Sequence, residues 1–577
     1  MKEKLKKNIT EALEKWGVSD VSFSVEATND ETHGEYATNV AMVSAKILKT
    51  NPKALASELV SELSENLPKE IEKVEVAGPG FINFFLKREY FSDTVSHILK
   101  EGEHYGRSVA LKGQKVMVEY TDPNPFKEFH IGHLMSNTIG ESIARLYEVQ
   151  GAEVKRACYQ GDVGLHVAKA IWGMQSVPER DENPLNSLSP EAQAQYLGHA
   201  YQLGSAAYEG GEKDAIEEIN RKVYDRSDSE INKLYDWGRK VSLAYFDGQY
   251  KKLGTKFDFN FFESEMAKPG LEIVRKFLGR LFQESDGAIV FHAEKHNPKL
   301  HTRVYITSQG LPTYEAKELA LHVAKARKYP ADASIVITAN EQDGVFAVGL
   351  EAFRQIDKEH ASRVKHVSHG MLRLPTGKMS SRTGGVITAD ELIFSIVSKL
   401  KEKFSESERK ADEVTLESVS IGAIKYSILR QSIGSDIIFD LEKSVSLEGD
   451  SGPYLQYAAV RAHSILEKAK AEGVRGSLTS TGNVEVRLPH EWQTRSFERL
   501  LSHFPEVVER AGAEFAPQYI STYLIEIAAS FNNFYAQEKI VDKDDPHSPY
   551  KLALTKAFRT VMENGLWILG IKVPERM

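Results

Sequence analysis

One strand–helix–strand segment, residues 115–160, constrains the fold more than any other feature of the chain. Its first part, "KVMVEY", is a short apolar run typical of a buried strand, and its last part, "EVKRACYQ", is strand-like again. Between them, Ile139, Ile143 and Leu146 fall on one helical face, and Gly151 provides a helix stop. A strand, a crossing helix and a second strand predict a βαβ unit, in which the two strands are parallel.

Four further apolar runs between residues 288 and 370 alternate with helical segments. They read "AIVFHA", "RVYIT", "SIVIT" and "VKHVSHG". Strands of a parallel sheet are covered on both faces and therefore read as continuous apolar runs. We expect all four to join the βαβ unit in one parallel sheet, which predicts an α/β fold with a Rossmann-like parallel-sheet domain.

The chain is too long for a single core, and a chain of this length should divide into about three or four domains. An early amphipathic helix and the strand-like stretch "KVEVAGPGFINFFLK" predict a small α+β module at the N-terminus. Strand signals nearly vanish in the last part of the chain. The expected domains are an α+β domain at 1–107, the parallel-sheet domain at 108–445 with a mainly helical insertion at about 177–285, and an all-α domain at 446–577.

The composition is that of an ordinary soluble protein, with 41% hydrophobic and 27% charged residues. No apolar run reaches the roughly eighteen residues of a membrane span, and the N-terminus lacks the apolar core of a secretory signal. We therefore expect a cytoplasmic protein without a membrane partner. Cys158 is the single cysteine, which excludes an internal disulfide and a cysteine-cluster zinc site. The net charge of −9 argues against non-specific coating of nucleic acid but is compatible with a local basic groove.

The stretch "DPNPFKEFHIGHLMSN" lies between the first strand and the first helix of the predicted sheet. Open α/β sheets bind ligands at this turn, and the positive N-terminus of the helix faces the ligand there. His130 and His133 are about one turn apart, and Gly132 permits close approach to the backbone. The pattern favours binding of phosphate groups whose charge develops in a transition state. A pair of surface or metal-binding histidines is the alternative.

A second polar motif, "LRLPTGKMSSRTGG", follows about 250 residues later, whereas the usual glycine-rich nucleotide loops are missing. A glycine-flanked loop that carries Lys378 and Arg382 is suited to closing over a triphosphate. Taken alone, such a loop is more often a solvated turn. Both motifs together indicate a nucleotide site.

The motifs resemble the signatures of class I aminoacyl-tRNA synthetases, HIGH and KMSKS. "HIGH" stands at residues 130–133, and "KMSSR" at residues 378–382 is a divergent KMSKS. Four more stretches resemble patterns of arginyl-tRNA synthetases: "TDPNPFKEFHIGH", "QGDVGLH", "TYEAKE" and "GPYLQYAAVR". "HGEYATNVAM" and "GPGFINFFL" near the N-terminus and the closing "VPERM" are similar to the same family, so the resemblance spans the whole chain.

The resemblance implies that arginine is activated with ATP to arginyl-adenylate and then transferred to the 3′ end of tRNA(Arg). Mg2+ is expected on the ATP phosphates, and no zinc is expected. Because Ser381 stands where the family pattern has lysine, Lys127 is expected to replace the missing charge. The implied catalytic residues are His130, His133, Lys127 and Lys378, and the implied ATP-binding residues are His130, Gly132, His133, Lys378, Met379, Ser380 and Arg382.

The resemblance also implies a set of arginine-binding residues. Tyr314 and Glu318, one helical turn apart, would hold the guanidinium, although Tyr314 could simply pack. Glu318 is one methylene longer than the aspartate usual in the family. The implied arginine-binding residues are Glu119, Asn124, Tyr314, Glu318 and Gln342.

The expected partners are tRNA(Arg), L-arginine and ATP, and the protein is expected to be a monomer. By resemblance, residues 1–107 form the additional N-terminal domain that contacts tRNA, and residues 446–577 form the anticodon-binding domain. Binding of tRNA should weaken with salt. The aromatic residues available to stack anticodon bases are Tyr454, Tyr457, Phe531, Phe534 and Tyr535, most of which are expected in the helix core.

Three other readings compete with this one. Another HxGH nucleotidyltransferase would share the chemistry but is typically short and lacks the helical C-terminal domain. A class I synthetase for another amino acid, such as cysteine or glutamine, would show other pocket motifs. An inactive RNA-binding paralogue would have lost the histidines or the Lys378 loop, which are intact here.

Overall fold

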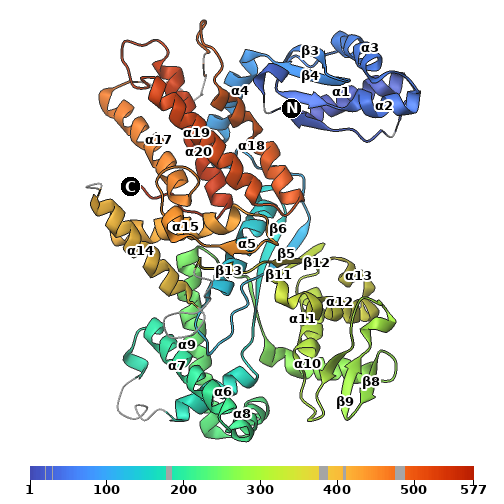
Figure 1. Ribbon diagram of the computed structural model, residues 1–577, viewed down its shortest axis with the longest axis vertical. Coiled ribbons are helices and arrows are strands. Elements are labelled where there is room, and N and C mark those ends of the chain that lie inside the picture. Colours follow the sequence, from blue (N-terminus) through green and yellow to red (C-terminus); the bar gives the residue numbers. More distant parts are fainter. Residues whose placement is uncertain are drawn as a thin grey trace. The chain divides into compact units, whose positions relative to one another are not determined.

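The computed structural model describes residues 1–19, 21–28, 30–176, 185–375, 387–406, 411–474, 486 and 488–577 (Figure 1). These residues divide into two compact units. The first unit consists of residues 1–105, 461–506 and 526–564, and the second of residues 106–460, 507–525 and 565–577. The residues expected to form an all-α domain therefore contribute to both units.

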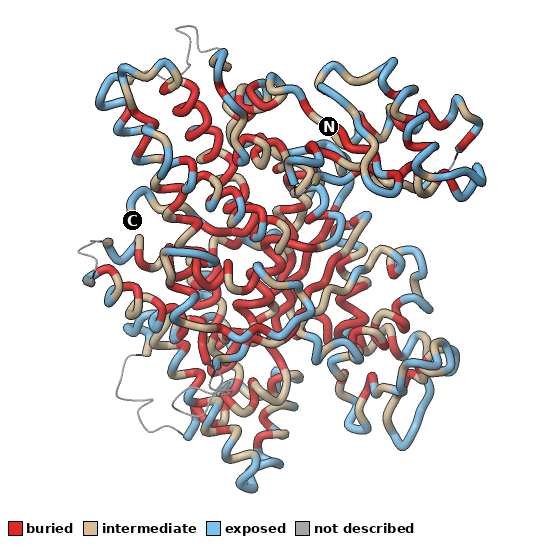
Figure 2. Tube along the Cα trace, turned by 45° about the horizontal axis from the view of Figure 1, so that its top comes forward, coloured by how far each residue is buried: buried red, intermediate tan, exposed pale blue. Residues whose placement is uncertain are grey.

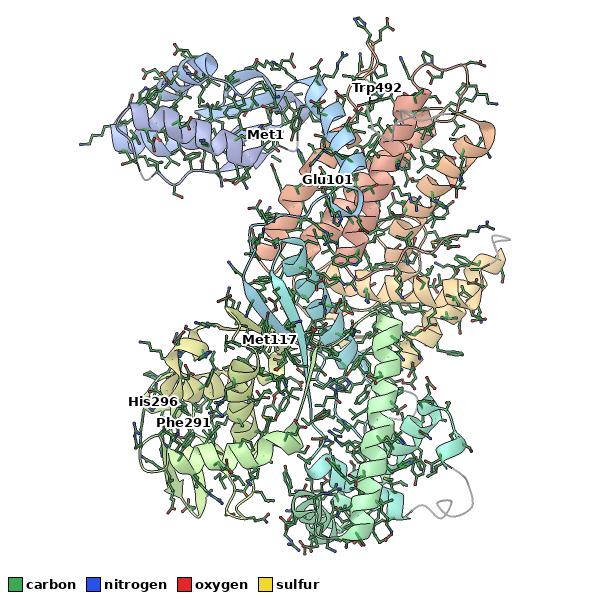
Figure 3. The ribbon with its side chains drawn as sticks, turned by 180° about the vertical axis from the view of Figure 1, so that it is seen from behind. Met1, Glu101, Met117, Phe291, His296 and Trp492 are labelled. Atoms are coloured by element: carbon green, nitrogen blue, oxygen red, sulfur yellow. The ribbon has the colours of Figure 1, made fainter. Side chains whose placement is uncertain are left out.

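The second unit contains a five-stranded, fully parallel sheet (Figure 1). Its central strand β5 is buried, and Met117 on this strand, labelled in Figure 3, is 1% exposed. The predicted α/β fold and βαβ unit are therefore confirmed, with α5 (Ile131–Val149) connecting β5 to β6. In spatial order the strands are β12 (Val364–His369), β11 (Ala333–Ala339), β5 (Lys115–Glu119), β6 (Glu153–Gln160) and β7 (Phe259–Phe262).

The strand order reverses beside β5. From β5 the chain proceeds outward through β6 to β7, and it then returns to add β11 and β12 on the opposite side of β5. The loops that follow β5 and β11 consequently diverge at the carboxyl ends of these strands. Such a reversal is the place where open α/β sheets bind ligands.

Two of the predicted strands do not belong to the parallel sheet, so that part of the prediction was wrong. "AIVFHA" and "RVYIT" form β9 (Ala288–Phe291) and β10 (Arg303–Ile306) of a separate antiparallel sheet with β8 (Phe282–Ser285). Asp286 and Gly287 connect β8 to β9 with φ angles of 50° and 78°. A two-residue turn with both φ angles positive produces a hairpin, so β9 pairs with its neighbour in sequence rather than with β5.

The small antiparallel sheet has a core of its own. Phe282 lies 4.9 Å from Tyr305 between ring centroids, and Phe291 stacks on His296 at 5.4 Å. Figure 3 labels Phe291 and His296 beside each other, apart from Met117 in the parallel sheet. The apolar character of β9 and β10 therefore reflects this local core.

The insertion after β6 is helical. It contains α6 (Leu165–Ser176), α7 (Pro190–Glu209), α8 (Lys213–Asp225) and the long α9 (Ser229–Leu253). β7 at residues 259–262 pairs with β6, so the segment expected to be helical to about residue 285 includes an edge strand of the parallel sheet. α6 and α7 pack closely because Gly173 and Gly204 each bring one helix against the other's backbone.

The remaining elements of the second unit surround these sheets. Figure 2 colours the chain by burial, and α5 and α15 (Glu413–Leu429) are buried along most of their length. Lys425 is buried and donates to the carbonyl oxygens of Leu253 at 2.6 Å and Gly570 at 2.8 Å. The elements are α10 (Glu263–Lys276), α11 (Tyr314–Lys328), α12 (Asp343–Ile356), α13 (Lys358–Ser362), β13 (Leu372–Arg373), α14 (Ala389–Glu406), α15 (Glu413–Leu429), β14 (Ile437–Ile438) and α16 (Leu441–Ser444).

The first unit begins with the predicted α+β module. Its four strands form an antiparallel sheet in the order β1-β2-β4-β3. The strand-like stretch is a hairpin that turns through Gly78 and Gly80, both with positive φ. The elements are α1 (Lys2–Lys15), β1 (Val25–Ala27), β2 (Tyr36–Thr38), α2 (Val40–Leu48), α3 (Pro52–Glu65), β3 (Ile71–Ala77), β4 (Phe81–Leu86) and α4 (Arg88–Glu101).

From residue 446 onward, the described part of the chain contains four long helices and no strand. They are α17 (Gly452–Glu472), α18 (Ser496–Ala513), α19 (Gln518–Gln537) and α20 (Ser548–Ile568). Phe531 stacks on Phe558 at 3.9 Å, and Phe534 is buried beside them, whereas Tyr535 is exposed. In the described residues no helix is long and apolar enough to cross a membrane.

The α6–α7 packing yields a stability prediction. A Cβ atom on Gly204 would lie 1.8 Å from the carbonyl oxygen of Lys169, so Gly204→Ala must separate the two helices. We expect a loss of about 1–3 kcal/mol in the free energy of unfolding. Gly248→Ala in α9 is the matched control, since no atom lies within 4 Å of its new Cβ. It should be neutral or stabilising by up to about 1 kcal/mol.

Urea unfolding followed by circular dichroism measures both variants. Equal stability of Gly204→Ala and the parent protein would contradict the close packing of α6 on α7.

Candidate active site

The turn between β5 and α5 has a strained backbone. Thr121, Asp122 and Phe126 have positive φ angles of 81°, 45° and 68°. Hydrogen bonds hold this conformation: the Thr121 amide donates to Ser136 Oγ at 3.0 Å, and the Phe126 amide donates to Ser242 Oγ at 2.8 Å. Strain of this kind costs free energy and persists where the surrounding structure fixes it, typically at functional sites.

His130 and His133 cap the N-terminus of α5 together. The Gly132 amide donates to His130 Nδ1 at 3.1 Å, and the His130 amide donates to His133 Nδ1 at 3.3 Å. The two rings stack with centroids 3.6 Å apart. Because an amide can only donate, Nδ1 of each ring must be the acceptor, and a neutral ring then has its proton on Nε2. Both imidazoles therefore offer an Nε2–H donor at a helix N-terminus.

Both histidines are neutral near pH 7. Burial, reinforced by the positive charge of Lys127, lowers the pKa of His130 to about 4. Burial and the neighbouring His130 lower the pKa of His133 well below its ordinary value. The stacked pair therefore acts as two hydrogen-bond donors without a formal charge.

The second nucleotide motif can be placed only by the segment that follows it. Lys378, Met379, Ser380 and Arg382 lie outside the described residues, as does Ser381. Directly after them, the Ile387 carbonyl accepts from the Ile131 amide at 3.1 Å, and the Ala389 amide donates to the Phe129 carbonyl at 2.8 Å. The segment that follows this motif is therefore attached beside His130.

Lys127 and Asn124 project from the same turn toward neighbouring elements. Lys127 Nζ lies 4.6 Å from the centre of the Tyr201 ring on α7. A Cβ atom on Gly161 would meet Asn124 Oδ1 at 2.4 Å, so Asn124 rests against the backbone that follows β6. Both residues are partly exposed at the carboxyl end of the sheet.

A pocket opens between α11, the end of β11 and α12. Three of the predicted arginine-binding residues line it together: Tyr314, Glu318 and Gln342. Tyr314 is 40% exposed, because its ring forms part of the pocket wall, whereas Glu318 is buried. The other lining residues are Glu315, His322, Thr338, Val345, Phe346 and Gly349.

A buried group of charges lies behind Glu318. Glu119 at the end of β5 forms an ion pair with Lys325 of α11 at 2.9 Å, and both side chains are buried. Burial and the negative charge of Glu119 raise the pKa of Glu318 to about 7. Burial and Glu119 also raise the pKa of Asp122, which accepts from the Tyr159 amide at 2.7 Å. The carboxyl groups of Glu119, Asp122 and Glu318 thus all interact electrostatically with the ammonium group of Lys325.

The sequence reasoning missed Asp122 and Lys325. Asp122 lies three residues after the end of β5, and Lys325 is seven residues from Glu318 on the same helical face, but nothing in the sequence pattern shows that the two residues meet. It also missed the role of Asp162, which was identified only as part of a family pattern. Asp162 is buried and accepts from Ser264 Oγ at 2.7 Å and Arg239 Nε at 2.8 Å, which joins the loop after β6 to α9 and α10.

The comparisons with known proteins agree along the whole chain. Residues 94–441 match the family model described as tRNA synthetases class I (R), catalytic domain. Residues 455–577 match the DALR anticodon binding domain, and residues 3–86 match the arginyl tRNA synthetase N terminal domain. Fold and motifs together are those of a class I aminoacyl-tRNA synthetase.

Individual relatives show to which family of class I synthetases the chain belongs. The chain is 32% identical to an arginine–tRNA ligase of Limosilactobacillus reuteri, and the match covers 100% of both chains. It is 30% identical to an arginine–tRNA ligase of Thermococcus sibiricus, over 100% of this chain and 98% of the relative. The solved Thermus thermophilus arginyl-tRNA synthetase has the same fold, with a TM-score of 0.79, 24% identity and 100% coverage of both chains. The chain belongs to the arginyl-tRNA synthetase family.

The low pKa of His130 predicts how stability depends on pH. The unfolded chain binds a proton at this histidine near pH 6.5, whereas the folded protein resists protonation down to about pH 4. The contribution of neutral His130 to the free energy of unfolding is therefore complete above pH 6.5 and is lost as the pH falls toward 4. Between pH 7 and 5, His130 should account for about 2 kcal/mol of lost unfolding free energy.

His130→Asn tests this prediction, because asparagine can still cap α5 but does not titrate. Urea unfolding at pH 7, 6 and 5 should show a smaller loss of stability in the variant than in the parent. Parallel pH dependences of the two proteins would contradict the buried, neutral state of His130.

Proposed function

We propose that this protein activates L-arginine with ATP and transfers it to tRNA(Arg), with the pocket at Tyr314 and Glu318 as the arginine site. The observation that carries the proposal is the surplus of carboxyl groups over cations behind this pocket. Glu119, Asp122 and Glu318 share the single cation of Lys325. Arginine brings two positive groups, a guanidinium and an α-ammonium, and so would complete a site that a neutral amino acid would leave unbalanced.

Within this proposal, Glu318 and Tyr314 hold the guanidinium, and Gln342 supports it from the opposite side of the pocket. A carboxylate can accept two parallel hydrogen bonds from a guanidinium, which lysine cannot match. Glu119 and Asn124 are assigned to the α-ammonium end, toward the carboxyl end of β5. This orientation directs the arginine carboxylate toward the turn that contains His130.

The activation step needs no covalent enzyme intermediate, and membership of this ligase family implies the use of ATP. The arginine carboxylate attacks the α-phosphate, and pyrophosphate leaves. We assign the Nε2–H groups of His130 and His133 to the phosphate oxygens, where donors fixed by α5 stabilise developing charge without rearrangement. Gly132 has no side chain and therefore lets the adenosine approach the backbone closely.

Positive charge for the departing pyrophosphate is assigned to Lys127 and to the loop with Lys378, Met379, Ser380 and Arg382. The described residues Ile387 and Ala389, which follow this segment in the sequence, are hydrogen-bonded beside His130, and this supports the assignment. Mg2+ would be held by the ATP phosphates, which require no dedicated set of protein ligands. Zinc has no part in the proposal.

For tRNA, we assign the anticodon to the C-terminal helices and the outer corner to the N-terminal α+β module. Phe531 and Phe534 are in the helix core and are unsuited to stacking a base, whereas Tyr535 is exposed with Arg461 5.4 Å from its ring. Exposed aromatic rings beside arginine are typical stacking sites for single-stranded bases. We further propose that the protein acts as a cytoplasmic monomer.

Replacement of Glu318 tests the proposal. Glu318→Gln keeps the shape of the side chain but removes its charge, so the guanidinium loses its ionic partner. We expect a loss of roughly 2–4 kcal/mol in the transition-state stabilisation measured by kcat/KM for arginine. Glu318→Asp should be milder, because it keeps the charge. Steady-state aminoacylation of tRNA(Arg) measures both variants.

Two controls accompany the experiment. The KM for ATP should change little in either variant, since the pocket lies apart from His130 on another helix. In the parent protein, kcat/KM for arginine should fall as the pH drops below 7, where Glu318 becomes protonated, and Glu318→Gln should lack this dependence. Normal arginine charging by Glu318→Gln would refute the assignment of the pocket.

A further inference from the structure

α11 presents three polar side chains at four-residue spacing to the same pocket. Tyr314, Glu318 and His322 all line this pocket. Residues four apart lie on one face of a helix, about one turn from each other. The proposed function assigns Tyr314 and Glu318 to the guanidinium. His322, one turn deeper along the same face, has no role in that assignment.

His322 is held rigidly. Its side chain is 3% exposed. The ring stacks on Phe353 with centroids 5.2 Å apart and an interplanar angle of 13°, and it meets the Phe346 ring edge-on at 5.6 Å. Two aromatic neighbours therefore fix the plane of the imidazole. A side chain fixed in this way can make a directional contact with little further loss of entropy.

One ring nitrogen of His322 nevertheless lacks a hydrogen bond. His322 Nδ1 is buried and has no hydrogen-bond partner among the described residues. A buried polar atom without a partner costs free energy, so such an atom beside a pocket indicates a missing ligand group or water. An aromatic residue of similar size would fill the same space between Phe346 and Phe353 without this cost.

The electrostatic surroundings define which group is missing. Burial and the positive charge of Lys325 lower the pKa of His322 well below its ordinary value, so the imidazole is neutral. The other titratable groups of the pocket are Tyr314, Glu315 and Glu318 on α11, and His366 stacks on Phe346 with centroids 4.0 Å apart. A neutral imidazole has one nitrogen that accepts, and a guanidinium has five N–H donors and no acceptor.

We propose that His322 is a specificity-determining residue of the arginine pocket and that its imidazole accepts a hydrogen bond from the guanidinium of the substrate. The contact would be the third from α11, after those of Tyr314 and Glu318. It rests on the proposed function, because it requires that the pocket bind arginine. The acceptor distinguishes a guanidinium from side chains that need a donor, and the rigid ring fixes the depth at which it is held.

Three variants separate this role from a packing role. His322→Phe keeps the aromatic packing and removes the acceptor. His322→Asn retains an acceptor near the position of Nδ1, and His322→Gln retains one near the position of Nε2. We expect His322→Phe to raise the KM for arginine by about 10- to 30-fold, as for loss of a hydrogen bond to a charged group. In the better of the two amide variants, the KM for arginine should be at least threefold lower than in His322→Phe.

The readout is aminoacylation of tRNA(Arg), with KM and kcat measured separately for arginine and for ATP. In His322→Phe the KM for ATP should match that of the parent protein, and the thermal unfolding temperature should be equal to or above that of the parent, because the unpartnered nitrogen is removed. If His322→Phe retains the parent's KM for arginine, or if neither amide variant is better than His322→Phe, the proposal is overturned. An equal rise in the KM for ATP would likewise overturn it, since a general distortion would explain the loss.

A binding measurement separates this proposal from the proposed function. Agmatine carries the guanidinium but no carboxylate and cannot be activated. Calorimetric titration of the tRNA(Arg)-bound protein with arginine and with agmatine should show both ligands weakened by His322→Phe. Weakening of arginine alone would overturn the guanidinium contact. If the parent protein binds neither ligand and charges no arginine, the proposed function itself fails.

Discussion

The reversal of strand order beside β5 is the constraint on which the rest of the site depends. β6 and β7 extend the sheet on one side of β5, and β11 and β12 extend it on the other. The loops after β5 and β11 must therefore part at the carboxyl edge, and the space between them is accessible to a ligand. The N-terminus of α5 and the pocket beside α11 both lie at this edge, so a phosphate site and an amino-acid site are brought together by topology alone.

The charges at this edge are arranged for a ligand rather than for stability. Folding buries Glu119, Lys325 and Glu318 together, and burial together with the negative charge of Glu119 raises the pKa of Glu318. Across the turn, His130 and His133 are kept neutral by burial and oriented by backbone amides. The pocket beside α11 thus has more carboxyl groups than cations, and the N-terminus of α5 supplies neutral hydrogen-bond donors. A cationic amino acid and an anionic nucleotide match these two regions respectively.

Local patterns in the sequence predicted the elements well, because apolar periodicity and turn residues act over a few positions. The β5–α5 turn and the βαβ unit could be predicted in this way, whereas Tyr314, Glu318 and Gln342 were implied by the resemblance to a known family. The partners of β9 and β10 could not be inferred from their apolar character, although Asp286 and Gly287 mark the hairpin in retrospect. The charge group of Asp122 and Lys325 depends on contacts between distant segments, which no local pattern contains.

ATP–pyrophosphate exchange, measured with each of the twenty amino acids in the presence of tRNA(Arg), tests the central claim most directly. It reports formation of the adenylate and therefore joins the amino-acid pocket to the phosphate site in one signal. The account predicts exchange with arginine, little or none with lysine, and loss of the arginine signal in Glu318→Gln. Exchange driven by another amino acid, or arginine exchange that survives Glu318→Gln unchanged, would contradict it.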